Sequence, residues 1–325
     1  MKLETLYRKA VAVGMARDLR GPEELGRLLA EERAKFEKLK NDERDAWEED
    51  RLFNPYADTR ILTGDRAAEV KKAFVGIDMD VGEILLAHAL NRDRGEGIDL
   101  VLAHHPAGIA LAQLAEVMRL QSDLLAAYGV NVSVAEQLMD KRIGEVERRV
   151  LPVNHFRSVD AARLLGLPMI CVHTPADNCV TAYLKDLFEK EKPARLKDAI
   201  ALLKKIPEYR RAVRRLAGPK IFSGSDQARC GKIFVDMTGG TEGAKTIYEH
   251  HAVAGVSTLV VMHLSEEGLE NAKKAHLNVV SAGHIASDNL GLNLLLDEVE
   301  QEGPLDVIGV SGFERVRASE RERAG

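Results

Sequence analysis

Two adjacent histidines, His104 and His105, precede Pro106 at the end of an apolar run over residues 98–103. The run predicts a β-strand, and the proline indicates where that strand ends, because proline has no N–H to donate to a neighbouring strand. Imidazole nitrogens are common ligands of transition metals, and two adjacent rings at a strand end can diverge toward two different ions. The pair alone does not distinguish a metal site from histidines in packing contacts.

Two later segments combine histidine and aspartate at one spacing. His173 is followed by Asp177, and His284 by Asp288, four residues later in each case. Both segments follow apolar runs of β type, LPMICV and LNVVSA, so all three pieces are predicted to lie at strand ends. We interpret them as one site assembled from separate parts of the sequence, because three such pieces together favour metal binding over isolated packing histidines.

The three pieces supply five candidate metal ligands: His104, His105, Asp177, His284 and Asp288. Mixed imidazole and carboxylate ligands suit divalent transition metals such as Zn, Fe, Mn or Co. The set exceeds the three protein ligands of a typical single catalytic zinc, and a carboxylate can bridge two ions. The sequence therefore predicts two ions with open positions for water, which is the chemistry of metal-assisted hydrolysis.

A Gly-rich segment, residues 238–243, links a predicted strand to a helix predicted over residues 244–255. Backbone N–H groups of such a turn can hold a phosphate or carboxylate, which makes Thr238, Gly239, Gly240 and Thr241 candidate anion-binding residues. The spacing matches neither a P-loop nor a dinucleotide-binding fingerprint, so an ordinary strand-to-helix turn is the competing interpretation.

The composition disfavours several other classes of protein. The formal net charge is −5 and aromatic residues make up 5% of the 325 residues, which disfavours nucleic-acid binding by base stacking in a basic groove. Cys171, Cys179 and Cys230 form no C-x-x-C pair and fit a reducing compartment. No segment resembles a signal peptide or reaches the length of a membrane span. We expect a cytoplasmic protein that binds neither nucleic acid nor membrane.

Strand-like and helix-like segments alternate from about residue 70, which predicts an α/β fold with a parallel or mixed sheet. The predicted strands include one over residues 130–135 and a last one over residues 306–313. Four parts are expected: a helical N-terminal extension (1–53), a first α/β lobe (54–184), a charged helical connector (185–217) and a second α/β lobe (218–325).

The two predicted lobes resemble each other in sequence. Asp78 in IDM matches Asp236 in VDM, an offset of 236 − 78 = 158, and His104 matches His263, an offset of 263 − 104 = 159. Such a duplication predicts two lobes that face each other across the metal site. It also places His263 near the site, as an additional ligand, a group that orients a ligand, or a substrate contact.

On these motifs the chain resembles the NGG-one-interacting-factor-three-like proteins, some of which are called GTP cyclohydrolase I type 2 homologues. The family's His-His-Pro, His-Thr-x-x-Asp and Gly-His-x-x-x-acid segments match residues 104–106, 173–177 and 283–288 in order and spacing. The resemblance covers roughly residues 70–310. The chain departs from the pattern at Asp288, where the family usually has Glu, and at Val261-Met262-His263, where it often has Thr-Gly and an acid.

The resemblance implies two α/β lobes with a dinuclear metal centre in the cleft between them. It also implies a ring-like homo-oligomer, typically a hexamer. His173 would be a neighbour of the ions, acting as an acid/base or as an orienting group. By carry-over, the metal ligands are the five residues already named: His104, His105, Asp177, His284 and Asp288.

Two functions remain open on this sequence. The first is a metal-dependent hydrolase of a small substrate, phosphorylated or nucleotide-like, in which metal-bound water attacks and His173 or His263 moves protons. The second is a metal-binding protein without catalysis, such as a metal carrier, an insertion factor or a regulator. Both functions use the same two divalent ions (Zn, Fe or Mn) and the same ligands.

Overall fold

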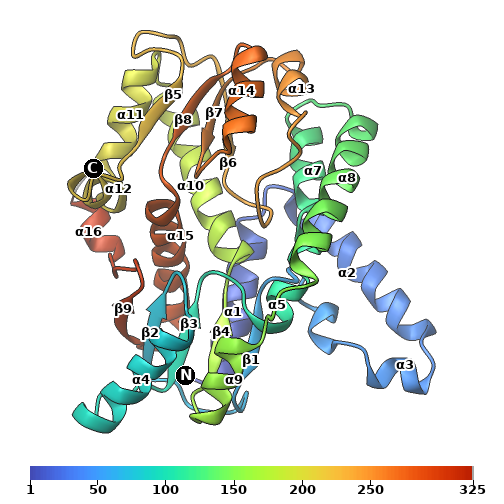
Figure 1. Cartoon of the computed structure of the whole chain (residues 1–325), viewed down its shortest axis with the longest axis vertical. Helices are drawn as coiled ribbons and strands as arrows, with labels where there is room; N and C mark the ends of the chain where they lie inside the picture. The colour runs from blue at the N-terminus through green and yellow to red at the C-terminus, as the bar shows by residue number, and fades with distance from the viewer. Residues whose placement is uncertain (324–325) are drawn as a thin grey trace.

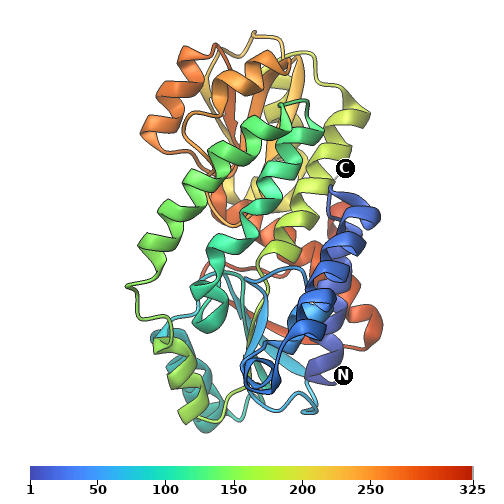
Figure 2. The same ribbon diagram turned by 90° about the vertical axis from the view of Figure 1, so that its right-hand side faces the viewer.

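The computed structural model describes residues 1–323, which form two β-sheets at opposite ends of the molecule with helices around and between them (Figures 1 and 2). The predicted two-lobed α/β fold is confirmed. The first sheet has the order β1-β4-β3-β2-β9 and the second β5-β8-β7-β6. The strands are β1 (Arg60–Thr63), β2 (Lys72–Gly76), β3 (Leu100–Ala103), β4 (Met169–Cys171), β5 (Lys220–Ser223), β6 (Lys232–Asp236), β7 (Val256–Val261), β8 (Asn278–Ser281) and β9 (Asp306–Val310).

The two sheets share one topology, apart from the additional edge strand β9. In each sheet the first strand pairs antiparallel with the fourth, and the remaining pairs are parallel. The antiparallel pairs even share an irregularity, which falls between Ile61 and Thr63 in β1 and between Ile221 and Ser223 in β5. The lobes are therefore internal structural repeats of each other.

Strand register corrects the sequence match between the repeats. Ala103 lies opposite Cys171 in the first sheet, as Val261 lies opposite Ser281 in the second. With Ala103 and Val261 equivalent, His263 corresponds to His105 and not to His104. The string that contains His104 was aligned one residue out, because βαβ units share apolar patterns that do not fix the register.

The N-terminal region is helical, as predicted, and its first helix is part of the first lobe. Helix α1 (Leu3–Ala16) buries Leu3, Leu6, Tyr7 and Ala10 in the core of the first lobe. By contrast, α2 (Gly21–Lys38) and α3 (Asn41–Asp45) extend from the body as an arm, on the right of Figure 1. A short 3-10 helix, η1 (Glu49–Leu52), returns the chain to the lobe.

The strand predicted over residues 130–135 is wrong, because α8 (Val132–Val150) begins there. The side chain of Asn131 accepts a hydrogen bond from Ser133 N at 3.0 Å and so caps the helix. Buried residues recur at helical spacing along α8, which outweighs the strand preference of its first valines. Helices α7 (Arg119–Ala127) and α8, whose residues were expected in the first lobe, pack on the second sheet.

Two long helices connect the lobes: α10 (Thr174–Glu191) and α15 (His284–Val299). Each helix contributes side chains both to the core of the first lobe and to that of the second. They pack against each other at Gly291, where an added Cβ would lie 2.4 Å from the carbonyl oxygen of Ala176. The glycine therefore permits a close approach near the start of both helices.

The remaining helices cover the sheets and complete the cores. The predicted connector is helical, and its buried side chains (Leu196, Ala199, Leu203 and Tyr209) belong to the core of the second lobe. The remaining helices are α4 (Val81–Arg94), α5 (Gly108–Ala112), α6 (Leu114–Val117), α9 (Arg157–Leu164), α11 (Leu196–Lys205), α12 (Pro207–Arg214), α13 (Tyr248–Val253), α14 (Glu266–Lys274), η2 (Glu300–Glu302) and α16 (Ala318–Glu322).

Two further expectations need correction. The last strand, β9, was expected in the second lobe but pairs in parallel with β2, so the chain returns to the first sheet. The helix expected directly after the Gly-rich segment 238–243 begins only at Tyr248, so that segment is not a helix N-terminus. Within residues 1–323, no helix combines the length and apolar character needed to cross a membrane.

Candidate metal centre

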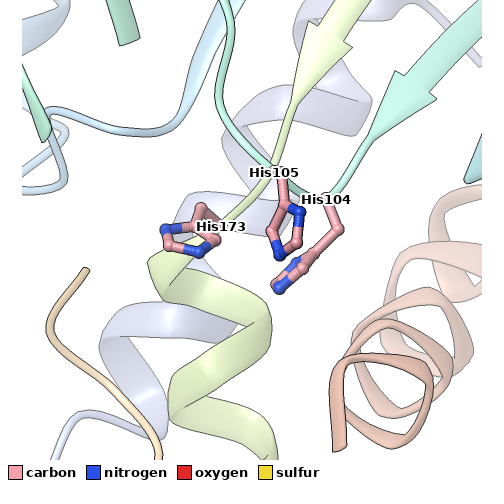
Figure 3. A group of neighbouring side chains, drawn as sticks. All are labelled: His104, His105 and His173. Carbon is pink, nitrogen blue, oxygen red and sulfur yellow. The ribbon is translucent and has the colours of Figure 1, made fainter. Parts of the chain in front are cut away.

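The three histidine-containing segments meet at the junction of the two lobes. His104 and His105 follow β3, His173 lies between β4 and α10, and His284 is the first residue of α15, after β8. The rings of His104, His105 and His173 lie together in Figure 3, with centroids 4.9 Å apart for His104 and His173. The ring of His284 lies 5.2 Å from that of His105. Helices α10 and α15 carry Asp177 and Asp288 into the same place.

His104 has one nitrogen engaged and one free. Its Nδ1 donates to the carbonyl oxygen of Val172 at 3.1 Å, which leaves Nε2 as the nitrogen that can hold a proton or a metal ion. That Nε2 lies 3.4 Å from Asp177 Oδ1 and 3.5 Å from Asp288 Oδ1. Within residues 1–323, His104 Nε2, Asp177 Oδ1 and both Asp288 oxygens are buried without a hydrogen-bond partner. Buried polar atoms are nearly always satisfied, so this set fits the donors of a cation.

His105 and His284 share the second oxygen of Asp288. The Nε2 atoms of His105 and His284 lie 3.6 Å and 3.5 Å from Asp288 Oδ2. The other nitrogen of His105, Nδ1, donates to Asp78 Oδ1 at 2.7 Å. Asp288 thus directs one oxygen to His104 and the other to His105 and His284.

His173 has the orientation of a metal ligand. Its Nδ1 donates to Asp58 Oδ2 at 2.8 Å, and Thr174 Oγ1 donates to the same oxygen at 2.7 Å. Its Nε2 lies 3.7 Å from Asp177 Oδ2, on the side of the cluster. Potential ligand atoms of His104, His105 and His173 lie within 4.8 Å of one another. A carboxylate that holds the second ring nitrogen is typical of metal-bound histidine.

Sequence reasoning missed Asp58 and Asp78, the two carboxylates that orient these rings. Asp58, in the segment before β1, was not among the candidate residues, and Asp78 was noted only as part of the repeat. Each lies within two residues of a strand, β1 or β2, beside the strands that carry the histidines. The position of each aspartate next to a strand end was the only feature of the sequence that pointed to the site.

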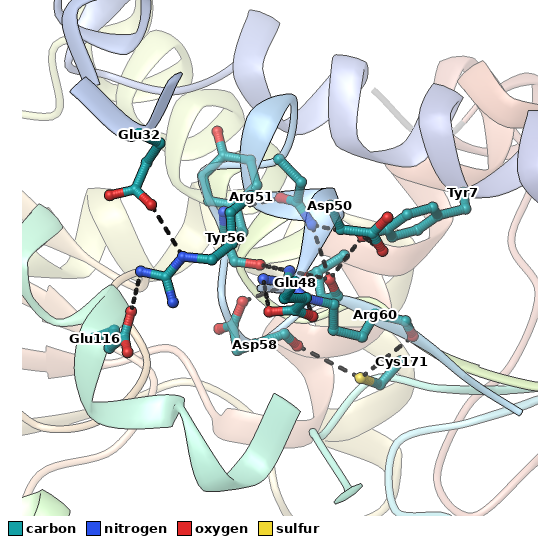
Figure 4. A network of polar contacts seen from close by, with 12 residues as sticks. Tyr7, Glu32, Glu48, Asp50, Arg51, Tyr56, Asp58, Arg60, Glu116 and Cys171 are labelled. Carbon is teal, nitrogen blue, oxygen red and sulfur yellow. Dashed lines mark hydrogen bonds and ion pairs between the residues drawn. The ribbon is translucent and has the colours of Figure 1, made fainter. Parts of the chain in front are cut away.

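The loop that carries Asp58 is fixed by the N-terminal region (Figure 4). Arg60, a buried residue, donates to the carbonyl oxygens of Tyr56 and Thr59 at 2.5 and 2.7 Å and pairs with Glu48. Tyr7 donates its hydroxyl to Asp50 Oδ2 at 3.0 Å. Arg60, anchored by Glu48, thus holds the backbone on both sides of Asp58.

The electrostatics of the cluster favour a bound cation. Burial alone would lower the pKa of His104, but Asp288 and Asp177 outweigh it and raise that pKa well above its usual value. Burial would raise the pKa of Asp288, yet His104, His284 and His105 lower it. Burial and the charges of His104 and His173 lower the pKa of His105 to about 4. The proton held at His104 is one that a metal ion would replace, because both use the same nitrogen.

A cavity of about 60 Å³, the inner cavity, adjoins the cluster and has His263 in its wall. The ring of His263 lies 4.8 Å from that of His284. Burial, and the charge of His284, lower the pKa of His263, so its ring is neutral at pH 7. His263 belongs to none of the ligand groups, and its role in catalysis stays a prediction.

Part of the Gly-rich segment also lines the inner cavity, together with Asp236 and Glu242. Thr238 Oγ1 is already engaged, since it donates to Asn178 Oδ1 at 2.6 Å. The Asp236 side chain is open to the cavity, but the surrounding protein and Glu242 raise its pKa to about 6. Asp236 beside the segment and Glu242 within it disfavour an anion there, and anion binding at Thr238, Gly239, Gly240 and Thr241 stays a prediction.

Comparisons with known proteins give one strong similarity. No family model matches the chain, and no curated protein sequence does. A NIF3 superfamily protein from Sphaerobacter thermophilus superposes with a TM-score of 0.68 at 28% identity, covering 79% of this chain and 92% of that one. Reduced HcgD from Methanocaldococcus jannaschii gives a TM-score of 0.46 at 14% identity, covering 77% and 87%. A Bacillus cereus protein related to NIF3 gives 0.36 at 9% identity, covering 78% and 89%.

Proposed function

The chain is a NIF3-like protein, that is, one of the NGG-one-interacting-factor-three-like family, and from this premise we propose that it binds two divalent transition-metal ions and hydrolyses a small substrate. The observation that supports the proposal is the set of buried, unpartnered ligand atoms on His104, Asp177 and Asp288. Such a set is costly to bury without a cation that satisfies it.

The donor set divides into two groups joined by Asp288. One ion would use His104, Asp177 and one oxygen of Asp288, and the other would use His105, His284 and the second oxygen. His173 lies beside the first group, and its contact with Asp58 favours a ligand role over the proton-carrying role expected from sequence. Nitrogen and carboxylate donors together suit Zn, Fe or Mn.

Bound ions of this kind supply Lewis acidity toward a substrate oxygen and a lowered pKa for water. The residues of the chain do the remaining work. Asp58 and Asp78 hold the rings of His173 and His105 in place, so the ligand geometry is set before a substrate arrives. His263 and Asp236 line the inner cavity and are positioned to accept and return a proton.

One observation favours the alternative, a metal carrier or regulator without catalysis. The inner cavity measures only about 60 Å³, which is little room for an organic substrate beside the cluster. The cluster also has a route for release of an ion at His284, because the side chain of His284 is 38% exposed.

Turnover separates the two functions. We expect the metal-reconstituted protein to hydrolyse at least one member of a panel of phosphomonoesters, phosphodiesters, amides and cyclic amidines. Asp288→Asn should abolish the activity, while Asp140→Asn, an exposed change on α8, should not. A protein that binds its ions, exchanges them freely and turns over none of the panel is a carrier or regulator instead.

A further inference from the structure

A larger cavity, about 460 Å³, adjoins the metal cluster on its His284 side. We call it the side cavity. Helices α12 and α15, which pack against each other (Figure 1), form part of its wall, and Phe222 of β5 forms another part. Four residues line both the side cavity and the inner cavity: Met262, His263, Leu264 and His284. The two cavities therefore meet at the His263 and His284 rings.

The two uncharged polar side chains of the side cavity, Ser281 and Asn289, are already satisfied within the protein. Ser281 Oγ donates to the carbonyl oxygen of Met262 at 3.1 Å. Asn289 Nδ2 donates to the carbonyl oxygens of Ile285 and Gly312 at 2.8 and 2.7 Å. A ligand in this cavity would therefore meet few free hydrogen-bonding groups until it reaches His263 and His284.

The charges in the wall are also paired. Arg211 donates to Glu314 at 3.1 Å and to Glu320 at 3.2 Å, and Arg215 pairs with Glu314. Glu208 pairs with Arg321 at 3.1 Å. Because the arginines are neutralised by a neighbour, the wall offers no free cation to a phosphate chain or another anionic tail.

Apolar side chains form the rest of the wall. Phe222 and Ile285 are 42% and 41% exposed, although both are large apolar side chains. They line the side cavity with Met262, Leu264 and Val316. A ligand that covers these side chains gains affinity by removing apolar surface from water.

We propose that the side cavity binds the uncharged, apolar body of the substrate, aromatic or aliphatic, while an oxygen-bearing group of that substrate reaches the metal cluster past His263 and His284. The volume lies in the usual range for small-molecule pockets, about 300–1,000 Å³, and compensates for the small inner cavity. This proposal rests on the proposed metal-dependent function, and it narrows the substrate class from nucleotide-like molecules to amphiphilic ones.

Two metal-binding probes that share one headgroup test the proposal. Acetohydroxamate carries a methyl group and benzohydroxamate a phenyl ring, so their difference in affinity reports the side cavity alone. By calorimetry on the metal-reconstituted full chain, we expect benzohydroxamate to bind tighter by on the order of tenfold or more, the value of burying a ring. Metal content measured after each titration checks that the probes do not extract the ions.

Substitutions in the cavity wall test whether the preference for the phenyl probe arises in the side cavity. Ala212→Phe on α12 should fill the side cavity and remove the preference for the phenyl probe, with the affinity for acetohydroxamate unchanged. Ala201→Phe, an exposed change on α11 outside the cavity wall, should keep the preference. If Ala212→Phe does not fold, Phe222→Ser, at an exposed edge-strand position, should reduce the preference instead.

Equal affinity for the two probes in the unaltered protein would overturn the proposal. So would a folded Ala212→Phe protein that keeps the full phenyl preference. If the protein holds no metal site, neither hydroxamate will bind. That result differs from equal affinity for the two probes, and it would overturn the proposed function and this proposal together.

Discussion

Asp288 is the residue on which the proposed metal centre depends. It is fully buried, and its two oxygens lie 3.5 to 3.6 Å from the Nε2 atoms of His104, His105 and His284. The family usually has Glu at this position, with one more methylene. Here Asp288 lies in the first turns of α15, and the aspartate side chain suffices to approach both histidine groups.

Asp58 should matter to metal affinity although it is not itself a ligand. Asp58→Asn keeps the size of the side chain but weakens the hold on His173 Nδ1, so we expect the metal Kd to rise about 10- to 100-fold. Competition with a chromophoric chelator measures this. The matched change, Asp65→Asn in the turn before β2, contacts only the local backbone and should leave the Kd unchanged. An unchanged Kd in Asp58→Asn would show that His173 is not a ligand.

Metal affinity should rise with pH. The pKa of His104 lies well above its usual value, so below that pKa the ion must displace a proton from Nε2. While His104 is protonated, the apparent affinity should rise by about tenfold for each pH unit, and binding should release a proton. Calorimetry in two buffers of different ionisation enthalpy counts the protons. Binding at pH 7 without proton release would contradict the protonated state assigned to His104.

At the scale of elements, the positions of α10 and α15 set the distance between Asp177 and Asp288. Gly291→Ala would place a Cβ 2.4 Å from the carbonyl oxygen of Ala176, so the helices must move apart. We expect a loss of about 1–3 kcal/mol in the free energy of unfolding and weaker metal binding. Gly26→Ala is the control, because an added Cβ on α2 meets nothing within 4 Å, and it should stabilise slightly. Equal denaturation midpoints for the two variants would refute this packing argument.

Local sequence patterns predicted the strands and helices that carry the site. They did not predict the contacts between those elements. The apolar runs before His104, His173 and His284 correctly predicted three strand ends, because a run and its end are local features. The pairing of β9 with β2 and the packing of α8 on the second sheet depend on residues far apart in sequence, so no local pattern reveals them. Asp58 was missed for the same reason, since its partner His173 is 115 residues away.

At the scale of the molecule, the two lobes share cores and do not form independent units. Helices α10 and α15 place side chains in both lobes, and α7 and α8 cross from the first part of the chain to the second sheet. The cluster lies where these shared helices begin. The duplicated topology therefore explains why two of the donor segments follow equivalent strands, β4 in one lobe and β8 in the other, while the third follows β3.

We also propose that the chain forms a homo-oligomer, as the family resemblance implies. Large apolar side chains remain exposed on the first lobe, including Leu85 and Leu86 on α4 and Leu164 on α9, and such surface is commonly covered by another subunit. Light scattering should give a mass that is a multiple of the 35.8 kDa chain, six for a hexameric ring. A mass of one chain at all concentrations would contradict the proposal.

The most direct test of the metal centre is a count of bound metal ions. Untagged protein reconstituted with Zn, Mn or Fe should hold two ions per chain by mass spectrometry after removal of free metal. Asp288→Asn, with its fold checked by circular dichroism, should lose both, because Asp288 lies in both ligand groups, whereas Asp140→Asn should keep them. No stoichiometric metal in the unaltered protein, or full retention of both ions in Asp288→Asn, would contradict the dinuclear site.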